Sequence, residues 1–371
     1  MTPLEAEIRA LIAAEGPLSV SRYMALCLGH PVHGYYLTRD PLGAKGDFTT
    51  APEISQMFGE LLGLWAAAVW QSMHAPDVLR LVELGPGRGT LIADALRAGR
   101  IVPGFLPAVD VHLVETSPVL RRKQEDALRP SGVPVTWHER IEDVPDGPVI
   151  VLANEFFDAL PIAQFVRGAN GWHERKVGLG PDGTLAFGVD PIASPMAATF
   201  ARNVPPPYAP GAILEHLESG ALDALASRLA SGEGAALVID YGHVRSGLGD
   251  TLQALSAHRF ADPLDRPGEA DLTAHVDFAA LARSALQAGA RAFGPLTQGE
   301  FLERLGLSAR AERLKFNATP VQKEVVDSAH RRLSGTGKGE MGELFKVLCL
   351  TSPTFEAPPG FDPSEAFSET P

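Results

Sequence analysis

A run of alternating glycines is the first feature of the sequence with the spacing to bind a cofactor. Gly85, Gly87 and Gly89 lie in residues 83–90 (Glu-Leu-Gly-Pro-Gly-Arg-Gly-Thr), between an apolar run and a predicted helix. Glycines let the backbone turn tightly and approach a ligand, because no Cβ stands in the way. Thr90 occupies the third glycine position of the dinucleotide fingerprint, and no Lys-Ser/Thr pair of a P-loop follows. The spacing therefore favours another kind of cofactor turn.

Two further positions at strand ends are candidates for cofactor contacts. Glu115 ends the second apolar run, where an acid in a doubly wound fold accepts hydrogen bonds from ribose hydroxyls. Ile141 and Glu142 follow the third run, at the place where a residue flanks an adenine in this fold. The alternatives are a solvated strand-end charge for Glu115 and ordinary loop residues at the other two positions.

Asn154, Glu155 and Asp158 interrupt an apolar stretch directly after the fourth run. The carboxyl end of a central strand is where open α/β sheets bind their ligands. Buried carboxylates need partners, and a guanidinium suits them because a carboxylate binds it through two hydrogen bonds. We therefore predict catalytic roles for these three residues. The alternative is that Asp158 caps a helix and Glu155 contacts only the cofactor.

The elements that must position these residues follow from the apolar pattern. Short runs rich in Val, Ile and Leu are typical of parallel strands buried on both faces. They lie at 78–84, 109–115, 133–137, 149–153 and 236–239, with helical patterns at 88–98 and 117–128 between the first three. Such β-α units predict an α/β fold with a doubly wound sheet. We expect 345–350 to add an antiparallel strand at the sheet edge.

The same pattern predicts the domain organisation. Residues 1–75 form a helical N-terminal extension and lid, with helices at 4–15, 18–28 and 53–74, and Thr50 lies where the lid would contact the cofactor. Residues 76–352 form the α/β domain, with insertions at 161–234 and 243–340 around the acceptor cleft. The Pro/Glu/Ser-rich segment 353–371 is expected to be a flexible tail.

Composition excludes several classes of protein. A net charge of −13 argues against a general nucleic-acid footprint. The two cysteines lie far apart and no Cys/His cluster accompanies them, so we expect neither a disulfide framework nor a metal site. The sequence contains no apolar run of about 18 residues, so we expect no membrane span. Two acids among the first seven residues do not fit a presequence, which predicts a cytoplasmic protein.

The turn, with its pattern Glu-x-Gly-x-Gly-x-Gly, resembles the first motif of class I S-adenosylmethionine-dependent methyltransferases. Further blocks resemble the MidA-like family, which includes the mitochondrial complex I assembly methyltransferases. These blocks are residues 46–60, 154–161, 240–242, 249–253, 271–278 and 341–346, and the resemblance covers roughly residues 15–350. It implies S-adenosylmethionine as the cofactor, with Glu83 helping to organise the turn.

The family resemblance also implies an activity. That activity is protein arginine methylation, forming symmetric dimethylarginine on the 49 kDa-type subunit of complex I (NADH dehydrogenase). The compartment would be the mitochondrial matrix in eukaryotic relatives and the cytoplasm in a bacterial one. Methyl transfer is an in-line displacement that needs an aligned nucleophile and no metal. We expect Tyr241, His258, His275 and Asp277 to line the acceptor cleft, with His243, Asp271 and Thr273 nearby.

Two other functions fit the same residues. The chain could be a small-molecule O- or N-methyltransferase, for which a deep, closed apolar pocket would be the sign. It could also be an assembly chaperone that binds S-adenosylmethionine with little turnover, although the intact residues 83–89 disfavour that reading. The sequence identifies neither the acceptor residue nor the oligomeric state, and a homodimer is one possibility.

Overall fold

The chain folds into two compact units, each assembled from separated segments. The computed structural model describes residues 1–38, 50–218, 220–256 and 259–368. The segments Thr49–Phe157, Ala221–Val244 and Asp277–Pro371 form one unit, which we call the core unit. The segments Met1–Phe48, Asp158–Gly220 and Arg245–Val276 form the other, which we call the accessory unit. The expected N-terminal extension is therefore divided: residues 1–48 share the accessory unit with parts of both expected insertions, whereas residues 49–75 belong to the core unit.

The core unit contains a mixed sheet with the strand order β15-β16-β10-β5-β2-β3-β4. Five consecutive strands of this sheet, β10, β5, β2, β3 and β4, are parallel to one another. Strand order reverses at β2, whose neighbours β3 and β5 both follow it in sequence, as in a doubly wound fold. The predicted fold class is confirmed. The strands are β2 (Leu79–Leu84), β3 (Val109–Val114), β4 (Val135–His138), β5 (Val149–Asn154), β10 (Gly234–His243), β15 (Arg291–Thr297) and β16 (Phe345–Thr351).

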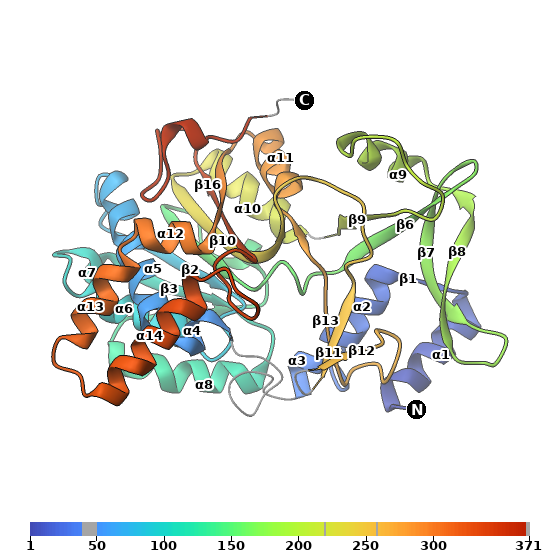
Figure 1. Ribbon diagram of the computed structural model, residues 1–371, viewed down its shortest axis with the longest axis horizontal. Coiled ribbons are helices and arrows are strands. Elements are labelled where there is room, and N and C mark those ends of the chain that lie inside the picture. Colours follow the sequence, from blue (N-terminus) through green and yellow to red (C-terminus); the bar gives the residue numbers. More distant parts are fainter. Residues whose placement is uncertain (39–49, 219, 257–258, 369–371) are drawn as a thin grey trace. The chain divides into compact units, whose positions relative to one another are not determined.

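Apolar residues on both faces explain why these segments form buried parallel strands. All six residues of β5 are buried. Leu81 and Ile150 pack in one cluster with residues of α5 (Gln56–Ser72) and α6 (Thr90–Gly99). Val82 and Val151 alternate with them and are also fully buried, so the opposite face is covered as well. α10 (Gly220–Ser231) lies near that side in Figure 1, and α11 (Phe278–Ala288) contacts β10 and β16.

The late strand is antiparallel, as predicted, but its predicted place at the sheet edge is wrong. β16 pairs with β10 on one side and with β15 on the other, so β15 is the edge strand. Gly294 and Pro295 lie within β15, and the pairing shifts register between Phe293 and Leu296. A proline inside an apolar run argues against a central strand but is tolerated at an edge or a bulge. That local signal concealed β15 in the sequence.

The predicted helix over 53–74 is two helices. α4 (Ala51–Ile54) ends at Ser55, which has an extended backbone with φ −161°. The Ser55 hydroxyl accepts a hydrogen bond from the Met57 N–H and caps α5. Serine competes for backbone hydrogen bonds and therefore favours a cap over a helix interior. The break matters because it separates the residues of α4 from the long buried helix.

The accessory unit contains the two N-terminal helices and two small sheets. α1 (Pro3–Glu15) and α2 (Val20–Gly29) bury Ile8 and Met24 in a cluster shared with Leu272. One sheet has the order β1-β7-β6-β9, with β8 paired to β7, and the other has the order β12-β11-β13. These strands are β1 (Leu18–Ser19), β6 (Ile162–Gly168), β7 (Gly171–Leu179), β8 (Leu185–Ala193), β9 (Ile213–Leu217), β11 (Gln253–Ser256), β12 (Arg259–Ala261) and β13 (Asp271–Thr273).

The second expected insertion is divided between the units. Residues 245–276 belong to the accessory unit, whereas 277–340 belong to the core unit and contain β15. This part also forms α11, α12 (Gln298–Arg304), α13 (Leu307–Lys315) and α14 (Pro320–Ser334). Among the described residues, no helix combines the length and the apolar character needed to cross a membrane.

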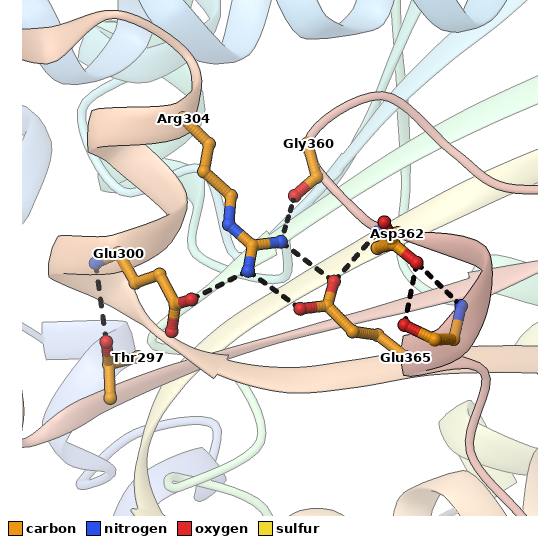
Figure 2. Close-up of polar contacts among 7 residues, drawn as sticks. Thr297, Glu300, Arg304, Gly360, Asp362 and Glu365 are labelled. Carbon is orange, nitrogen blue, oxygen red and sulfur yellow. Dashed lines mark hydrogen bonds and ion pairs between the residues drawn. The ribbon is translucent and has the colours of Figure 1, made fainter.

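The expectation of a flexible tail is wrong for residues 353–368, which pack on the core unit. Phe361 is buried against Phe301, with ring centroids 5.3 Å apart. Figure 2 shows Arg304 of α12 between Glu300 and Glu365, and its Nη2 lies 2.6 and 2.7 Å from their Oε1 atoms. Composition misled because two buried aromatics, Phe355 and Phe361, supply apolar contacts that an average over the segment hides.

Candidate cofactor and acceptor site

The three alternating glycines form a tight turn between β2 and α6. Gly85, Gly87 and Gly89 have φ values of +61°, +55° and +79°, which favour glycine at each position. The Gly85 N–H donates to the Val114 carbonyl at 3.1 Å, which ties the turn to the neighbouring strand β3. Gly89 is the N-cap residue of α6. The turn therefore lies between the first parallel strand and a helix, as the sequence predicted, and the structure places it at the carboxyl edge where strand order reverses.

Glu83 is a buried acid directly before this turn. Its side chain is 3 % exposed, and its carboxylate accepts a hydrogen bond from the Ile92 N–H. Within the described residues its Oε2 atom is buried and has no hydrogen-bond partner. Burial raises the pKa of Glu83 well above 4.5, and the nearby Glu115 raises it further. A buried acceptor without a donor is costly, so a ligand that donates hydrogen bonds fits this position.

Glu115 is the second buried acid at the same edge, directly after β3. Its Oε1 accepts the Ser117 N–H at 2.8 Å and its Oε2 accepts the Gln124 Nε2 at 3.0 Å. Burial raises the pKa of Glu115, while these two hydrogen bonds oppose the rise. A carboxylate has about four lone-pair sites, so Glu115 keeps capacity for further donors. Its position fits the predicted contact with ribose hydroxyls.

Gln124 is a residue of this site that the sequence reasoning missed. It lies on α8 (Pro118–Leu128), is fully buried, and donates to the Gly87 carbonyl at 2.7 Å. Its Oε1 accepts the indole N–H of Trp137 at 2.9 Å. A signal was present, because Leu120, Gln124 and Leu128 follow one another at helical spacing and are the buried residues of α8. A polar residue on an apolar helix face needs partners inside the protein.

α4 connects the glycine turn with the end of β5. The Ala51 N–H donates to Glu155 Oε1 at 3.3 Å. Glu53 accepts a 2.5 Å hydrogen bond from the Thr90 hydroxyl, and its Oε2 lies 3.6 Å from Arg88 Nη1. Thr50 is the N-cap residue of α4, but its side chain makes no capping hydrogen bond. Residues 46–49 of the same sequence block lie outside the described residues.

Asn154 and Glu155 lie where β5 ends. Asn154 is 9 % exposed, and its Nδ2 donates to Glu155 Oε1 at 3.2 Å. Its Oδ1 is buried without a hydrogen-bond partner among the described residues. Glu155 has φ +51°, a left-handed conformation that costs a non-glycine residue about 1–2 kcal/mol. Backbone strain of this kind concentrates at functional sites, where the surrounding structure holds it in place.

Asp240 fixes the turn that follows. It is fully buried on β10, its Oδ2 accepts the Phe157 N–H at 3.0 Å, and its Oδ1 accepts the Tyr241 N–H at 2.9 Å. The Glu155 N–H donates to the Ile239 carbonyl at 2.9 Å. Two hydrogen bonds between the post-β5 turn and β10, from the Phe157 N–H and the Glu155 N–H, therefore hold Glu155 in its unusual conformation. Asp240 belongs to the sequence block at 240–242, but the sequence alone does not reveal this role.

The remaining predicted residues of the core unit lie in different surroundings. Ile141 is buried in a short 3-10 helix (Ile141–Asp143) after β4. Glu142 is paired with Arg140 at 2.7 Å, and the hydrogen bond from Arg140 lowers the pKa of Glu142. Tyr241 packs edge-on against Phe345, with ring centroids 5.6 Å apart.

Asp277 has a visible structural role. Its Oδ1 accepts the Ala280 N–H at 2.9 Å and caps α11. Its Oδ2 lies 3.9 Å from His243 Nε2, at the end of β10. The predicted contact with the acceptor would be additional to this cap.

Asp158 and His275 belong to the accessory unit. The Asp158 side chain is 6 % exposed, and its carbonyl accepts the Ala274 N–H at 2.9 Å. The Tyr36 hydroxyl donates to Asp271 Oδ1 at 2.8 Å, and burial together with the charges of Asp271 and Asp158 raises the pKa of Tyr36. The His275 N–H donates to the Thr251 hydroxyl at 2.9 Å. His258 lies outside the described residues.

Thr273 is also buried within this unit, and its hydroxyl accepts a hydrogen bond from Gln253 Nε2 at 3.2 Å. The structure thus brings the predicted residues together in two groups, one in each unit. Glu83, the glycine turn, Glu115, Asn154 and Glu155 lie along the sheet edge of the core unit, whereas Asp158, Asp271, Thr273 and His275 are joined through β13 and its neighbours.

Known proteins share this arrangement. Residues 61–296 match the family described as "Putative S-adenosyl-L-methionine-dependent methyltransferase". The chain is 39% identical to protein arginine methyltransferase NDUFAF7, mitochondrial, of Danio rerio, over 91% of this chain and 85% of that protein. It is 36% identical to the Homo sapiens protein of the same name, over 94% and 84% of the two chains.

A solved structure from Burkholderia thailandensis, bound to S-adenosyl-homocysteine, is similar throughout. The TM-score is 0.83 at 28% identity, and the match covers 98% of this chain and 95% of that one. The family match spans more than half of the chain, and it includes the turn at 83–89 and the end of β5. The chain therefore belongs to this family of S-adenosyl-L-methionine-dependent methyltransferases, and S-adenosyl-L-methionine is its cofactor.

Proposed function

We propose that this protein methylates arginine side chains of a protein substrate, forming symmetric dimethylarginine. The observation that carries the proposal is the Glu155 carboxylate, held beside the glycine turn at the end of the central strand by Ala51 and Asn154. The curated relatives in the comparison, at 35–39% identity, are named protein arginine methyltransferases, which supports the same acceptor. The proposed substrate is the NADH dehydrogenase subunit of the 49 kDa type, modified during complex I assembly.

The cofactor roles are proposed from the geometry of the core unit. Gly85 and Gly87 leave room for the methionine and ribose parts, and Glu83 offers its unpartnered Oε2 to a donor of the ligand. Glu115 would accept the ribose hydroxyls and Ile141 would lie against the adenine. Glu142 and Thr50 are proposed to lie at the margin of the same site. S-adenosylmethionine, when bound, supplies a methyl group on a positively charged sulfur, which a nucleophile attacks in line.

Glu155 would orient the acceptor. A guanidinium has a pKa above about 12, so it reaches the site as a cation whose charge is spread over three nitrogens. A carboxylate that accepts two of its N–H groups fixes the plane and concentrates positive charge away from the attacking nitrogen. The fixed geometry of Glu155 serves this purpose, because a carboxylate free to rotate would lose the alignment.

The other acceptor contacts are proposed on the sequence alone. Asp158 is the second candidate carboxylate, three residues beyond Glu155. Tyr241, His258, His275 and Asp277 are proposed to bind the protein substrate.

Both cysteines are buried free thiols, which supports a reducing compartment, and we propose the cytoplasm. A homodimer is compatible with the proposal but not required by it.

The test is transfer of labelled methyl from S-adenosylmethionine into lysate of a strain that lacks this gene. Wild type and Glu155→Gln are run side by side, with Glu125→Gln on the exposed face of α8 as the matched control. Binding of S-adenosylhomocysteine to each variant shows that the cofactor site is intact. The proposal expects label in one protein band, mapped to dimethylarginine, kept in the control and lost in Glu155→Gln.

Three results would overturn the proposal. Label only in the small-molecule fraction would identify a small-molecule methyltransferase. No transfer in lysate or in isolated assembly intermediates of NADH dehydrogenase, despite tight binding of S-adenosylhomocysteine, would identify a cofactor-binding chaperone. Label in protein on a residue other than arginine would likewise contradict the proposed acceptor.

A further inference from the structure

Gln124 joins three parts of the core unit that are distant in sequence. Its Nε2 donates both to the Gly87 carbonyl at 2.7 Å and to Glu115 Oε2 at 3.0 Å, and its Oε1 accepts the Trp137 indole N–H at 2.9 Å. We propose that Gln124 is a positioning residue of the cofactor site, which fixes the glycine turn and the Glu115 carboxylate relative to each other.

The three hydrogen bonds allow only one orientation of the side-chain amide. The NH₂ group has two protons, and each finds an acceptor, one at Gly87 and one at Glu115. The indole of Trp137 is a donor only, so it must face the amide oxygen. In a flipped amide the NH₂ group would face the Trp137 N–H, donor against donor. The amide oxygen would then face the Gly87 carbonyl and Glu115 Oε2, acceptor against acceptor. Gln124 is therefore locked, which a positioning residue requires.

A second contact holds the turn on Gln124 independently of these hydrogen bonds. Gly89 has φ +79°, and a Cβ placed on it would lie 3.3 Å from the Gln124 Cα and 3.4 Å from its Cγ. The glycine turn thus packs directly on α8 at Gln124, and both the positive φ and the tight contact favour glycine at position 89. Gly87 is fixed by a polar bond and Gly89 by contact, both with the same residue.

The position of Glu115 depends on the same side chain. Its Oε1 is held by the Ser117 N–H, two residues along the chain, but its Oε2 is held by Gln124 from α8. Without that donor only backbone N–H groups of its own loop, those of Ser117 and Thr116, would hold the carboxylate. The inference rests on the proposed placement of the cofactor at Glu83, the glycine turn and Glu115. Gln124 would act through two of these groups and need not touch the cofactor itself.

Calorimetric binding of S-adenosylhomocysteine to the purified full chain tests the inference. Gln124→Glu keeps the volume but places a carboxylate against Gly87 and Glu115, and we expect the Kd to rise about a hundredfold. Gln124→Met removes the hydrogen bonds without adding charge, and we expect about tenfold. Trp137→Phe frees only the amide oxygen and is expected to give a rise of a few-fold.

Gln298→Met is the matched control. Gln298 is also a fully buried glutamine of the core unit, and its Nε2 donates to the Leu333 carbonyl at 2.8 Å, outside the proposed cofactor residues. The Gln298→Met variant loses a comparable buried hydrogen bond and should leave the Kd for S-adenosylhomocysteine unchanged. A second readout is the separation of KM from kcat: the Gln124→Met change should raise the KM for S-adenosylmethionine and leave kcat at saturation within about twofold.

The outcomes separate the inference from the placement on which it rests. Gly87→Val places a branched side chain at φ +55° in the turn and should abolish binding. If Gly87→Val binds as wild type does, the proposed placement is wrong and the inference falls with it. The other outcome is that Gly87→Val abolishes binding while Gln124→Met and Trp137→Phe have the same Kd as Gln298→Met. In that case the placement of the cofactor stands and the positioning role of Gln124 is wrong. If Gln124→Glu fails to fold, these milder variants decide in the same way.

Discussion

The Phe156 ring lies directly against Gly85, in tight contact with the position that a Cβ on this residue would take. A Cβ placed on Gly85 would be 3.1 Å from Phe156 Cδ2, closer than most real Cβ contacts. The glycine turn after β2 and the segment after β5 are thus packed against each other without an intervening side chain. This contact brings the proposed cofactor turn next to Glu155, the neighbour of Phe156 in the chain.

Substitution of Gly85 tests this packing. Gly85→Ala adds a methyl group at φ +61° and against Phe156. The left-handed backbone alone costs alanine about 1–2 kcal/mol, and the contact forces a further shift of the ring or the turn. We expect a total loss of about 2–3 kcal/mol in the free energy of unfolding, measured with urea, and weaker binding of S-adenosylhomocysteine.

Gly132→Ala is the control for the backbone contribution. Gly132 has φ +72°, and nothing lies within 4 Å of a Cβ placed on it. It should lose about 1–2 kcal/mol and keep cofactor binding. Equal losses in the two variants would show that Phe156 adapts freely and that the contact does not restrain the turn.

Glu83 should make the ligand-free protein less stable as pH rises. Burial raises the pKa of Glu83 above 4.5, so between 4.5 and the raised value the folded state binds more protons than the unfolded state. Stability therefore falls with rising pH through that window. Glu83→Gln removes the ionisation, and we expect higher stability than wild type at neutral pH and a flatter profile in urea titrations from pH 5 to pH 8.

The same change should impair function. A glutamine offers one acceptor oxygen in place of a carboxylate, so binding of S-adenosylhomocysteine should weaken about tenfold. Glu125→Gln on the exposed face of α8 serves as the control for both measurements. A Glu83→Gln variant that is no more stable than wild type at pH 7 would show that the carboxyl is solvated in the ligand-free protein.

The C-terminal segment should loosen when Arg304 is removed. Arg304 contacts both oxygens of Glu365 and the Gly360 carbonyl, but its side chain is 32% exposed. Partly exposed ion pairs contribute about 1 kcal/mol or less, so Arg304→Ala should scarcely change global stability. We expect faster amide hydrogen exchange confined to residues 360–367, measured by mass spectrometry.

Arg129→Ala, which removes an exposed pair with Asp126 at 2.6 Å, should leave exchange in this segment unchanged. Unaltered exchange in Arg304→Ala would mean that Phe361 and the hydrogen bond from Trp65 Nε1 to the Pro359 carbonyl hold the segment without the arginine.

Substitutions of Asp277 distinguish its role as a helix cap from a role in substrate binding. Asparagine caps a helix about as well as aspartate, so Asp277→Asn should keep the stability of α11. Asp277→Ala loses the bond to the Ala280 N–H and should cost about 1 kcal/mol. If the carboxylate binds a cationic protein acceptor, Asp277→Asn should raise the KM for the acceptor and leave the KM for S-adenosylmethionine unchanged. Wild-type kinetics in Asp277→Asn would leave the residue with the cap alone.

Patterns in the sequence were enough to predict the parallel strands β2, β3, β4, β5 and β10, the glycine turn, and the acids at the strand ends. These are local signals, because an apolar run, an alternation of glycines and an acid at a run's end are each complete within about ten residues. Since parallel strands present their carboxyl ends at one edge, local signals were also enough to place Glu83 and Glu115 at the same edge.

The remaining features depend on contacts between segments that are distant in sequence. The bond between Gln124 and Gly87, the one between Ala51 and Glu155, and the packing of Phe361 on Phe301 each join residues 37 or more positions apart. No periodicity in the chain specifies such a pair, because the energy of each contact depends on where two independently formed elements come to lie. The same reason explains why β15, with its proline, and the division of the second insertion between the two units became visible only in the folded chain.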